Sequence, residues 1–379
     1  MEPVWLQQER ESARKAHAGL QWPNFRYGLT MRMDYSDLPP ELVEACVSQQ
    51  TTQQTTIECA DESVIIMPLK EAIEKHSKLV EPYLFKIMAM PNKFAEFHRA
   101  FWSSGTFVYI PAQVELESPI VIRKSLAGSN INHTLIVADD ASAATIIEIA
   151  DGQQNGPLFV SNATEIIAKA NSSIRFISTQ NYPQNIFHFD YKNAEIDQDA
   201  QVHWHDCCLG SAFTHSTIHS LLNGIGSEST IKNMFLGSNQ QRFDIGAQIV
   251  HGASHTHGNI ETKGILMDSA KNMYRGLIRI ERDAPNSKGY QKEDVLMLSP
   301  ETEANSIPQL EIENNDVKCS HAATTTHVDK ERLFYLMARG ISETTARKLF
   351  VRGFIEPFIQ QLGSPVTAFI EDHIEQRLV

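Results

Sequence analysis

The sequence predicts a mainly β protein whose core is a β-solenoid flanked by helical regions at both ends. Three observations lead to this fold class. From Gly105 to about Ser320, short β-branched runs alternate with clusters of Asn, Asp, Gly and Ser, which is typical of strands and turns. A weak repeat of 28 or 29 residues runs through this part of the chain. Helix-forming segments precede and follow it.

The first region, residues 1–104, is predicted to be mostly helical. Val4–Leu20 is rich in Gln, Glu, Arg, Lys and Ala, which are good helix formers. Pro82–Met90 and Pro91–Phe101 each open with proline, which suits the first turn of a helix. Between them and the first helix, the polar stretch Ser48–Thr56 is predicted to be a loop.

The predicted core spans residues 105–325, and the repeat within it favours a solenoid. Small polar turns followed by strands recur at intervals of 28, 28, 29 and 29 residues, which places five side chains in register: Ile146, Ile174, Val202, Ile231 and Ile260. Each coil of a solenoid buries its inner face by stacking on the next coil, so it keeps such a period. A β-sandwich has no reason to keep it, and chance is the remaining alternative.

The last region, residues 326–379, returns to a helical pattern. Helices are predicted over Lys330–Arg339, from a Ser342 cap to Gly353, from near Phe354, and over Pro365–Val379.

Composition excludes several classes of function. The 379 residues carry a formal net charge of −13, which disfavours binding to nucleic acid or to an anionic membrane surface. No apolar run approaches the ~20 residues needed to cross a bilayer, and the N-terminus does not resemble a signal peptide, so a cytoplasmic location is expected. The five cysteines, an odd number widely spaced, are expected to be reduced thiols.

Common catalytic motifs are missing from the sequence. Neither phosphate-binding glycine pattern is present, nor is the G-x-S-x-G elbow, the H-E-x-x-H helix or a C-x-x-C pair. The chain is therefore not expected to hydrolyse nucleotides or to carry a zinc ribbon.

His203, His205 and Cys207 alternate along a predicted strand, so their side chains are expected to share one face. Imidazole and thiolate suit zinc, copper or iron–sulfur chemistry. A β-solenoid metalloenzyme using this group is a remote alternative function. The simpler explanation is a ladder of polar side chains on the solenoid surface.

Cys319 and His321 form the sharper candidate. They lie two residues apart at the end of the last predicted strand and are expected to share a face. Two ligands cannot close a tetrahedral metal site, so any further ligands must come from another chain, from sulfide or from distant residues. A buried cysteine beside a surface histidine is the alternative.

Six segments within about residues 240–360 together form a highly specific pattern. They are Tyr274-Arg275-Gly276-Leu277-Ile278, Asp294-Val295-Leu296-Met297-Leu298-Ser299, Ile307-Pro308-Gln309-Leu310-Glu311-Ile312, Asp316-Val317-Lys318-Cys319-Ser320-His321, Leu333-Phe334-Tyr335-Leu336-Met337-Ala338-Arg339-Gly340 and Val351-Arg352-Gly353-Phe354. These segments resemble the SufB/SufD family, the scaffold subunits of the Suf iron–sulfur cluster assembly system.

The resemblance implies a right-handed parallel β-helix between helical regions, in a subunit that is a scaffold and not an enzyme. It implies a dimer through the β-helices, with a SufB-type paralogue or a second copy as partner, and a transient iron–sulfur cluster shared at that interface. It also implies that the C-terminal helices dock the SufC ATPase. The residues expected there are Leu333, Phe334, Arg339, Phe350 and Phe354. Whether a flavin binds is left open.

Cys319-Ser320-His321 is similar to the C-S-H of SufD-type chains, which favours a SufD-like subunit. SufB-type chains usually carry an acceptor cysteine in the strand before Leu296, and Glu293 stands at that place here. The alternative within the family is a SufB-like or homodimeric scaffold in which Cys207 or Cys208 accepts sulfur.

Overall fold

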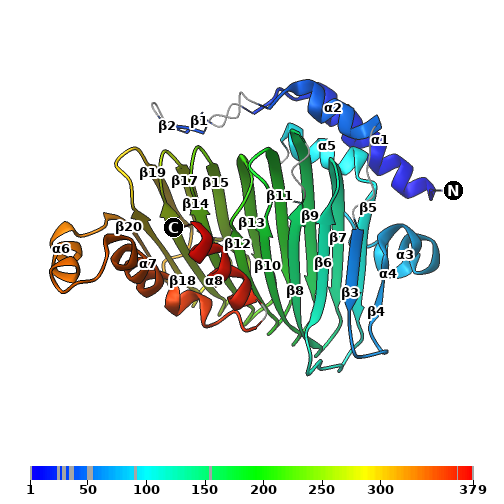
Figure 1. Ribbon diagram of the computed structural model, residues 1–379. Coiled ribbons are helices and arrows are strands. Elements are labelled where there is room, and N and C mark those ends of the chain that lie inside the picture. The colour runs from blue at the N-terminus through cyan, green and yellow to red at the C-terminus, as the bar shows by residue number, and fades with distance from the viewer. Residues whose placement is uncertain are drawn as a thin grey trace.

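The computed structural model describes residues 2–23, 26–27, 31–33, 38–48, 54–88, 92–152, 156–364 and 366–377 (Figure 1). The helices are α1 Val4–Gly19, α2 Pro40–Ser48, α3 Leu69–Lys75, α4 Ser77–Val80, α5 Lys93–Phe101, α6 Lys330–Ala338, α7 Glu343–Ile359 and α8 Val366–Arg377. Short strands near the N-terminus are β1 Arg26–Tyr27, β2 Met31–Arg32, β3 Gln54–Glu58 and β4 Ile65–Pro68. The remaining strands are β5 Ser104–Ile110, β6 Ile120–Leu126, β7 Asn130–Ala138, β8 Ala143–Gly152, β9 Leu158–Ala168, β10 Ser173–Asn181, β11 Ile186–Ile196, β12 Gln201–Cys208, β13 Phe213–Leu222, β14 Glu228–Gly237, β15 Arg242–His251, β16 His257–Leu266, β17 Lys271–Ile280, β18 Lys288–Met297, β19 Glu303–Ile312 and β20 Lys318–His327.

Successive strands from β5 onward go alternately to two sheets, which is the topology of a β-solenoid. Sheet one has the order β20-β18-β16-β14-β12-β10-β8-β6-β3, and sheet two has the order β19-β17-β15-β13-β11-β9-β7-β5-β4. Neighbouring strands are parallel except where β3 meets β6 and β4 meets β5. The predicted mainly β fold with a solenoid core and helices at both ends is confirmed.

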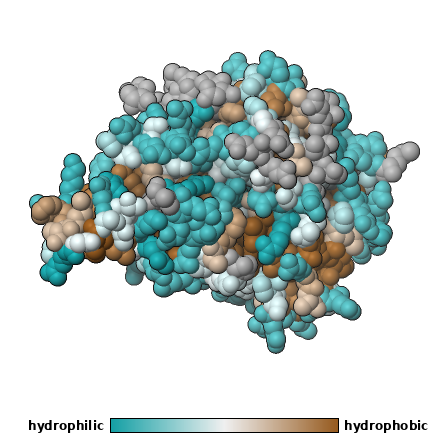
Figure 2. Space-filling model, in the orientation of Figure 1, coloured by the Kyte–Doolittle hydropathy of each residue, from teal (hydrophilic) through white to brown (hydrophobic). Residues whose placement is uncertain are grey.

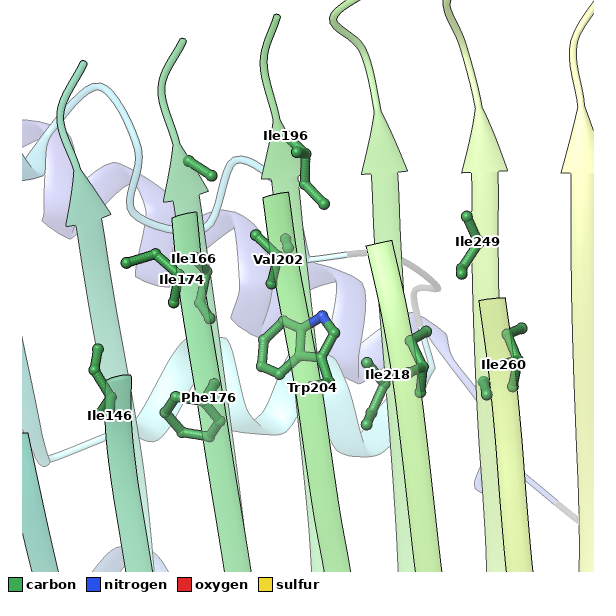
Figure 3. Packing of buried hydrophobic residues seen from close by; sticks show 14 of the residues in the cluster. Ile146, Ile166, Ile174, Phe176, Ile196, Val202, Trp204, Ile218, Ile249 and Ile260 are labelled. Atoms are coloured by element: carbon green, nitrogen blue, oxygen red, sulfur yellow. The ribbon is translucent and has the colours of Figure 1, made fainter. Parts of the chain in front are cut away.

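The space between the two sheets, called the lumen below, is filled mostly by β-branched and aromatic side chains (Figure 3). Ile146, Phe176 and Trp204 lie on successive strands of sheet one and stack along the solenoid axis. Burying an apolar side chain of this size contributes roughly 1.5–3 kcal/mol, so the stacked coils stabilise one another.

The predicted repeat has the right face but not always the right register. Ile174 lies opposite Val202, as predicted. Ile146, however, lies opposite Phe176 and not Ile174. This two-residue shift keeps the side chain on the same face, because side chains alternate along a strand with a period of two. Of the two remaining alignments, one is correct and one is shifted by two residues.

The N-terminal helices cover the outer face of sheet two. Side chains of α1, α2, α3 and α5 join those of β7, β9, β11 and β13 in one apolar cluster. The predicted helices over Val4–Leu20 and Pro91–Phe101 are present as α1 and α5, although residue 91 lies outside the described residues. The described residues of this region also include the strands β1 to β4, so it is less helical than predicted. One of them, β3, takes up the end of the predicted Ser48–Thr56 loop, and residues 49–53 lie outside the described residues.

The predicted helix over Pro82–Met90 was wrong. Residues 81–86 form turns, and residues 89 and 90 lie outside the described residues. Phe85 has a φ of 63°, which a right-handed helix does not allow. Its backbone N–H instead donates to the buried Glu165 carboxylate over 2.7 Å. A long-range hydrogen bond therefore overrides the local proline signal.

The C-terminal helices fold back over the outer face of sheet one. In Figure 1, α7 and α8 lie in front of the sheet, and their apolar side chains form one cluster with those of β6 to β18. Ser342 caps α7 as predicted, with its Oγ accepting a hydrogen bond from the Thr345 N–H. The predicted end at Gly353 was wrong, since α7 continues to Ile359 and buries Ile355 against the sheet. No described helix is long and apolar enough to span a membrane.

Candidate functional site

Cys319 and His321 lie on β20, the last strand of sheet one (Figure 1). β20 pairs with β18 in parallel, so Cys319 lies opposite Gly289 and His321 opposite Gln291. Within the described chain, β20 and β19 each end their sheet; β20 is largely exposed, and β19 is half-buried along most of its length. The solenoid is therefore open at this end.

Both side chains face the lumen of the terminal coil. Cys319 packs against the lumenal core, and its Sγ lies 3.0 Å from the point where a Cβ on Gly289 would be. The Nδ1 of His321 lies 3.4 Å from the Nε2 of Gln291, which is almost fully buried. The shared face expected from their spacing is thus present, with Cys319 half-buried and His321 exposed.

Burial raises the pKa of the Cys319 thiol, and a hydrogen bond from the Ser320 backbone opposes the rise. Because the thiolate is the form that binds metal, coordination by Cys319 must release a proton. A shallow groove of about 640 Å³ runs past this thiol across β14, β16, β18 and β20. Lys288 and Lys318 line it together with Glu228 and His257, so side chains of both charges border the approach to Cys319.

Sequence reasoning missed Gln291, which lies one coil inward from His321. Its Nε2 donates to the Gln309 carbonyl over 3.1 Å and also faces His321 Nδ1. Glu293 is on the same lumenal face and is 2% exposed. Burial raises the pKa of Glu293 to about 7, and the neighbouring polar side chains of Ser306 and Asn272 oppose the rise. The strand register was the one signal that could have linked Gln291 to His321.

His203, His205 and Cys207 lie on one face of β12, the outer face of sheet one. Cys207 is fully buried in the cluster formed with the C-terminal helices. Burial lowers the pKa of His205 to about 3. Among the described residues, no group of three or more His, Cys, Asp or Glu side chains is arranged to hold a metal ion. The structure therefore gives the metalloenzyme alternative no assembled site.

Cys207 and Cys208, the two alternative sulfur acceptors, are both buried. Cys207 lies beneath the C-terminal helices, and Cys208 faces the lumen, where its Sγ is 3.7 Å from Asp206 Oδ2. Burial raises the pKa of both thiols well above the usual value. All five cysteines of the chain are free thiols.

The residues predicted to dock a partner differ in exposure. On α6, Phe334 is 72% exposed and Leu333 is half-buried, while Arg339 just beyond the helix is exposed with its guanidinium 4.8 Å from the Tyr335 ring centroid. Apolar surface is visible at the left end of Figure 2, where α6 lies in Figure 1. On α7, Phe350 is half-buried and Phe354 packs toward sheet one.

Fold and site together define a class: a β-solenoid protein that presents a thiol and an imidazole on its open terminal coil. Two protein-family models match the chain. The one described as "SUF system FeS cluster assembly, SufBD core domain" matches residues 121–354, and "SufBD protein N-terminal region" matches residues 37–122. The chain belongs to the SufBD family.

Similar proteins include an iron–sulfur cluster assembly SufBD family protein of Staphylococcus saprophyticus, 31% identical over 311 residues. A protein of the same description from Staphylococcus aureus (strain MRSA252) is 30% identical over 315 residues. In both comparisons the match covers 80% of this chain and 67% of the relative.

Proposed function

We propose that this chain is a non-enzymatic, SufD-like scaffold subunit on which an iron–sulfur cluster forms transiently. Cys319 supplies a thiolate and His321 an imidazole, which are both ligands of iron in iron–sulfur sites. The observation that carries the proposal is the pair of ligand side chains on the lumenal face of the terminal coil. The cluster is cargo that is handed on.

A second subunit completes the site in this proposal. Two ligands leave the coordination of iron open, and the outer edges of β19 and β20 offer backbone groups for pairing with another chain. The partner is a SufB-type paralogue or a second copy of this chain. Free thiols and iron–sulfur chemistry both suit the reducing cytoplasm, where we place the protein.

A SufD-like role is favoured over a SufB-like or homodimeric scaffold. Glu293 stands where SufB-type chains usually carry an acceptor cysteine, and a carboxylate cannot accept a persulfide sulfur. Cys207 and Cys208 are too deeply buried to react as acceptors without opening of the fold. Mass spectrometry after incubation with a cysteine desulfurase tests this choice, because a SufB-like chain would gain persulfide on Cys207 or Cys208.

The test of the cluster site compares three variants in cluster assembly by the reconstituted complex. Cys319→Ala and His321→Ala are expected to lower the yield of assembled cluster at least tenfold, measured by absorbance and by activation of an apo-acceptor protein. Ser320→Ala is the matched control, because this neighbour alternates to the opposite face of β20. Unchanged assembly in both test variants would remove the proposed ligand role.

We also propose that α6 docks a SufC-type ATPase, within the predicted division into residues 1–104, 105–325 and 326–379. The chain lacks a phosphate-binding loop, so nucleotide hydrolysis would fall to that partner. Support comes from α6, which has no buried residue and exposes Phe334 and Tyr335. Large exposed apolar side chains on one element are typical of protein interaction sites.

Deleting everything after Asp329 would not test this docking cleanly, because α7 and α8 cover apolar residues of sheet one. The sharper variant is Phe334→Ser, which changes an exposed side chain and should leave the fold intact. It is expected to weaken ATPase capture at least tenfold in a binding titration. The control Glu331→Ala changes an exposed residue in the first turn of the same helix, and equal binding by both variants would contradict the proposal.

A further inference from the structure

A cluster of buried polar side chains lies inside the lumen, one coil inward from Cys319 and His321. It is formed by side chains of β16, β17, β18 and β19, and we call it the lumenal chamber: Thr262, Asn272, Tyr274, Gln291, Glu293 and Ser306. All except Ser306 are at most 2% exposed. Burying a polar group without a hydrogen-bond partner costs free energy. The partners of these groups therefore indicate what the chamber can bind.

The side chains of the chamber lie close to one another. Asn272 Nδ2 donates to Glu293 Oε1 over 3.3 Å. The hydroxyls of Tyr274 and Thr262 face each other, and Tyr274 is close enough to Glu293 to feel its charge. A Cβ on Gly276 would collide with both the Gln291 amide oxygen and the Tyr274 hydroxyl, so glycine at this position leaves room for two oxygens to converge.

The chamber holds five buried oxygen atoms that have no hydrogen-bond partner among the described residues: Gln291 Oε1, Asn272 Oδ1 and the hydroxyl oxygens of Thr262, Tyr274 and Ser306. The two amide oxygens are pure acceptors, the hydroxyls can donate or accept, and an ionised Glu293 adds two more acceptor oxygens. A carboxylate surrounded by buried oxygen atoms without partners is the chemistry of a cation site, since oxygen ligands bind hard cations.

We propose that the lumenal chamber binds one monovalent alkali cation, K⁺ or Na⁺. Glu293 neutralises its charge, and the amide and hydroxyl oxygens of Gln291, Asn272 and Tyr274 complete its coordination. The charge balance selects a monovalent ion: Glu293 is the one carboxylate of the chamber, and a divalent ion would leave a net positive charge in a low-dielectric site. The neighbouring Asp294 is engaged elsewhere, by Lys292 over 2.7 Å.

The cation competes with a proton for Glu293. Burial raises the pKa of Glu293 to about 7, so the carboxylate is available to a cation above that pH and is protonated below it. The groups that face Glu293 are uncharged: Asn272 and Tyr274 on β17, Ser306 on β19 and Thr262 on β16. Asp294 raises the Glu293 pKa further. Cation affinity should therefore rise with pH through about 7.

Occupation of the chamber would also steady the open end of the solenoid. Gln291 donates from Nε2 to the Gln309 carbonyl of β19 and faces His321 of β20 with the same nitrogen. A cation on Oε1 fixes this orientation of the amide, because the two ends of an amide cannot exchange while both are engaged. The ion thus ties β18 to both terminal strands.

The experiment compares thermal unfolding of the full chain in KCl and in tetramethylammonium chloride at equal ionic strength. Above the Glu293 pKa, at about pH 8.5, K⁺ is expected to raise Tm by about 2–4 °C. Glu293→Gln is expected to lose this increment. Glu311→Gln is the matched control, because this exposed carboxylate on β19 faces Arg279 outside the chamber and should keep the increment. Equal Tm values in the two salts, or an increment that persists in Glu293→Gln, would overturn the proposal.

Thallous ion provides a second measurement that does not depend on a variant folding. Crystals of the unmodified chain soaked in Tl⁺ are expected to show an anomalous peak between Glu293, Gln291 and Tyr274. Density for water alone at that position would refute the cation. The proposal stands apart from the cluster-forming function, because K⁺ stabilisation should survive Cys319→Ala while cluster assembly should not.

Discussion

At the scale of single residues, Cys207 and Cys208 show how one step along a strand changes the chemistry of a side chain. Cys208 faces the lumen beside Asp206, and Cys207 faces outward beneath the helix that carries Ile355. Both thiols are at most 2% exposed, and burial raises the pKa of each well above the usual value. Two thiols adjacent in sequence are therefore both inert, one because it is buried in the lumen and the other because it is buried beneath the C-terminal helices.

We expect an alkylating reagent to distinguish the cysteines of the native chain. Cys59 is exposed and should react first, while Cys207 and Cys208 should stay unmodified until the chain is unfolded. Peptide mass spectrometry after a short iodoacetamide pulse measures the three rates. A denatured sample, in which all sites should react alike, is the control. Modification of Cys207 as fast as Cys59 would show that the C-terminal helices do not seal it.

Glu293 should make stability depend on pH in tetramethylammonium buffer. Its pKa rises from 4.5 in the unfolded chain to about 7 in the fold, so the folded state binds more protons between these values. Stability should therefore fall as pH rises from about 4.5 to 7 and then level off, a total change of about 3 kcal/mol.

Glu293→Gln should remove this contribution to the pH dependence of the free energy of unfolding, as measured by urea unfolding between about pH 4.5 and 7. Glu311→Gln should keep it, because that side chain is exposed. The same slope in Glu293→Gln as in the unmodified chain would mean that Glu293 is not the group that titrates.

At the scale of elements, α7 illustrates packing that overrides local propensity. Gly353 favours a helix end, yet α7 runs through it, because Val351 and Ile355 on either side are buried against sheet one. Gly340, which follows α6, does end its helix and has a φ of 86°. The same residue type thus acts as a helix interior in one place and as a terminator in the other.

Alanine substitutions should separate the two glycines. Gly353→Ala is expected to stabilise the chain by about 0.5–1 kcal/mol, because alanine favours a helix interior and a Cβ there meets no atom within 4 Å. Gly340→Ala should destabilise by about 1 kcal/mol, since its backbone conformation disfavours a side chain. Thermal unfolding and hydrogen exchange of the α7 amides measure both effects. Destabilisation by Gly353→Ala would show that α7 is strained at this point.

At the scale of the whole molecule, helices close the two outer faces of the solenoid, and its last coil is left uncovered. The N-terminal helices pack on sheet two and the C-terminal helices on sheet one. Along the axis, β19 and β20 end the two sheets without a cover among the described residues. Helices thus cover the outer faces of both sheets, while the coil formed by β19 and β20 stays uncovered. Cys319 and His321 lie on that coil.

Removing α8 by ending the chain at Gly363 should uncover part of sheet one. Val366, Ile370 and Ile374 are buried there, so their loss should cost on the order of 5 kcal/mol. Arg377 also donates to the Leu236 carbonyl over 3.0 Å. The truncated chain should unfold at lower temperature and bind an apolar dye. An unchanged Tm with no dye binding would mean that α8 is dispensable for the fold.

Local pattern predicted much of this architecture. β-branched runs separated by small polar turns identified the strands, and the Ser342 cap identified the start of α7. What local pattern missed depended on distant contacts: Phe85 leaves the helical conformation because Glu165, 80 residues away, accepts its N–H. The depth of Cys207 depends in the same way on helices that come more than a hundred residues later.

The amino-acid sequence by itself determined the fold class and the shared face of Cys319 and His321, because side-chain alternation along a strand is a local property of the backbone. Only the tertiary structure decided that this face opens at the uncovered end of the solenoid, that Gln291 reaches His321, and that Glu293 is buried among oxygen atoms. Those facts depend on which strands become neighbours and on how far each coil is shifted. Parallel pairing across about 30 residues is fixed by packing of the whole lumen, and no local segment encodes it.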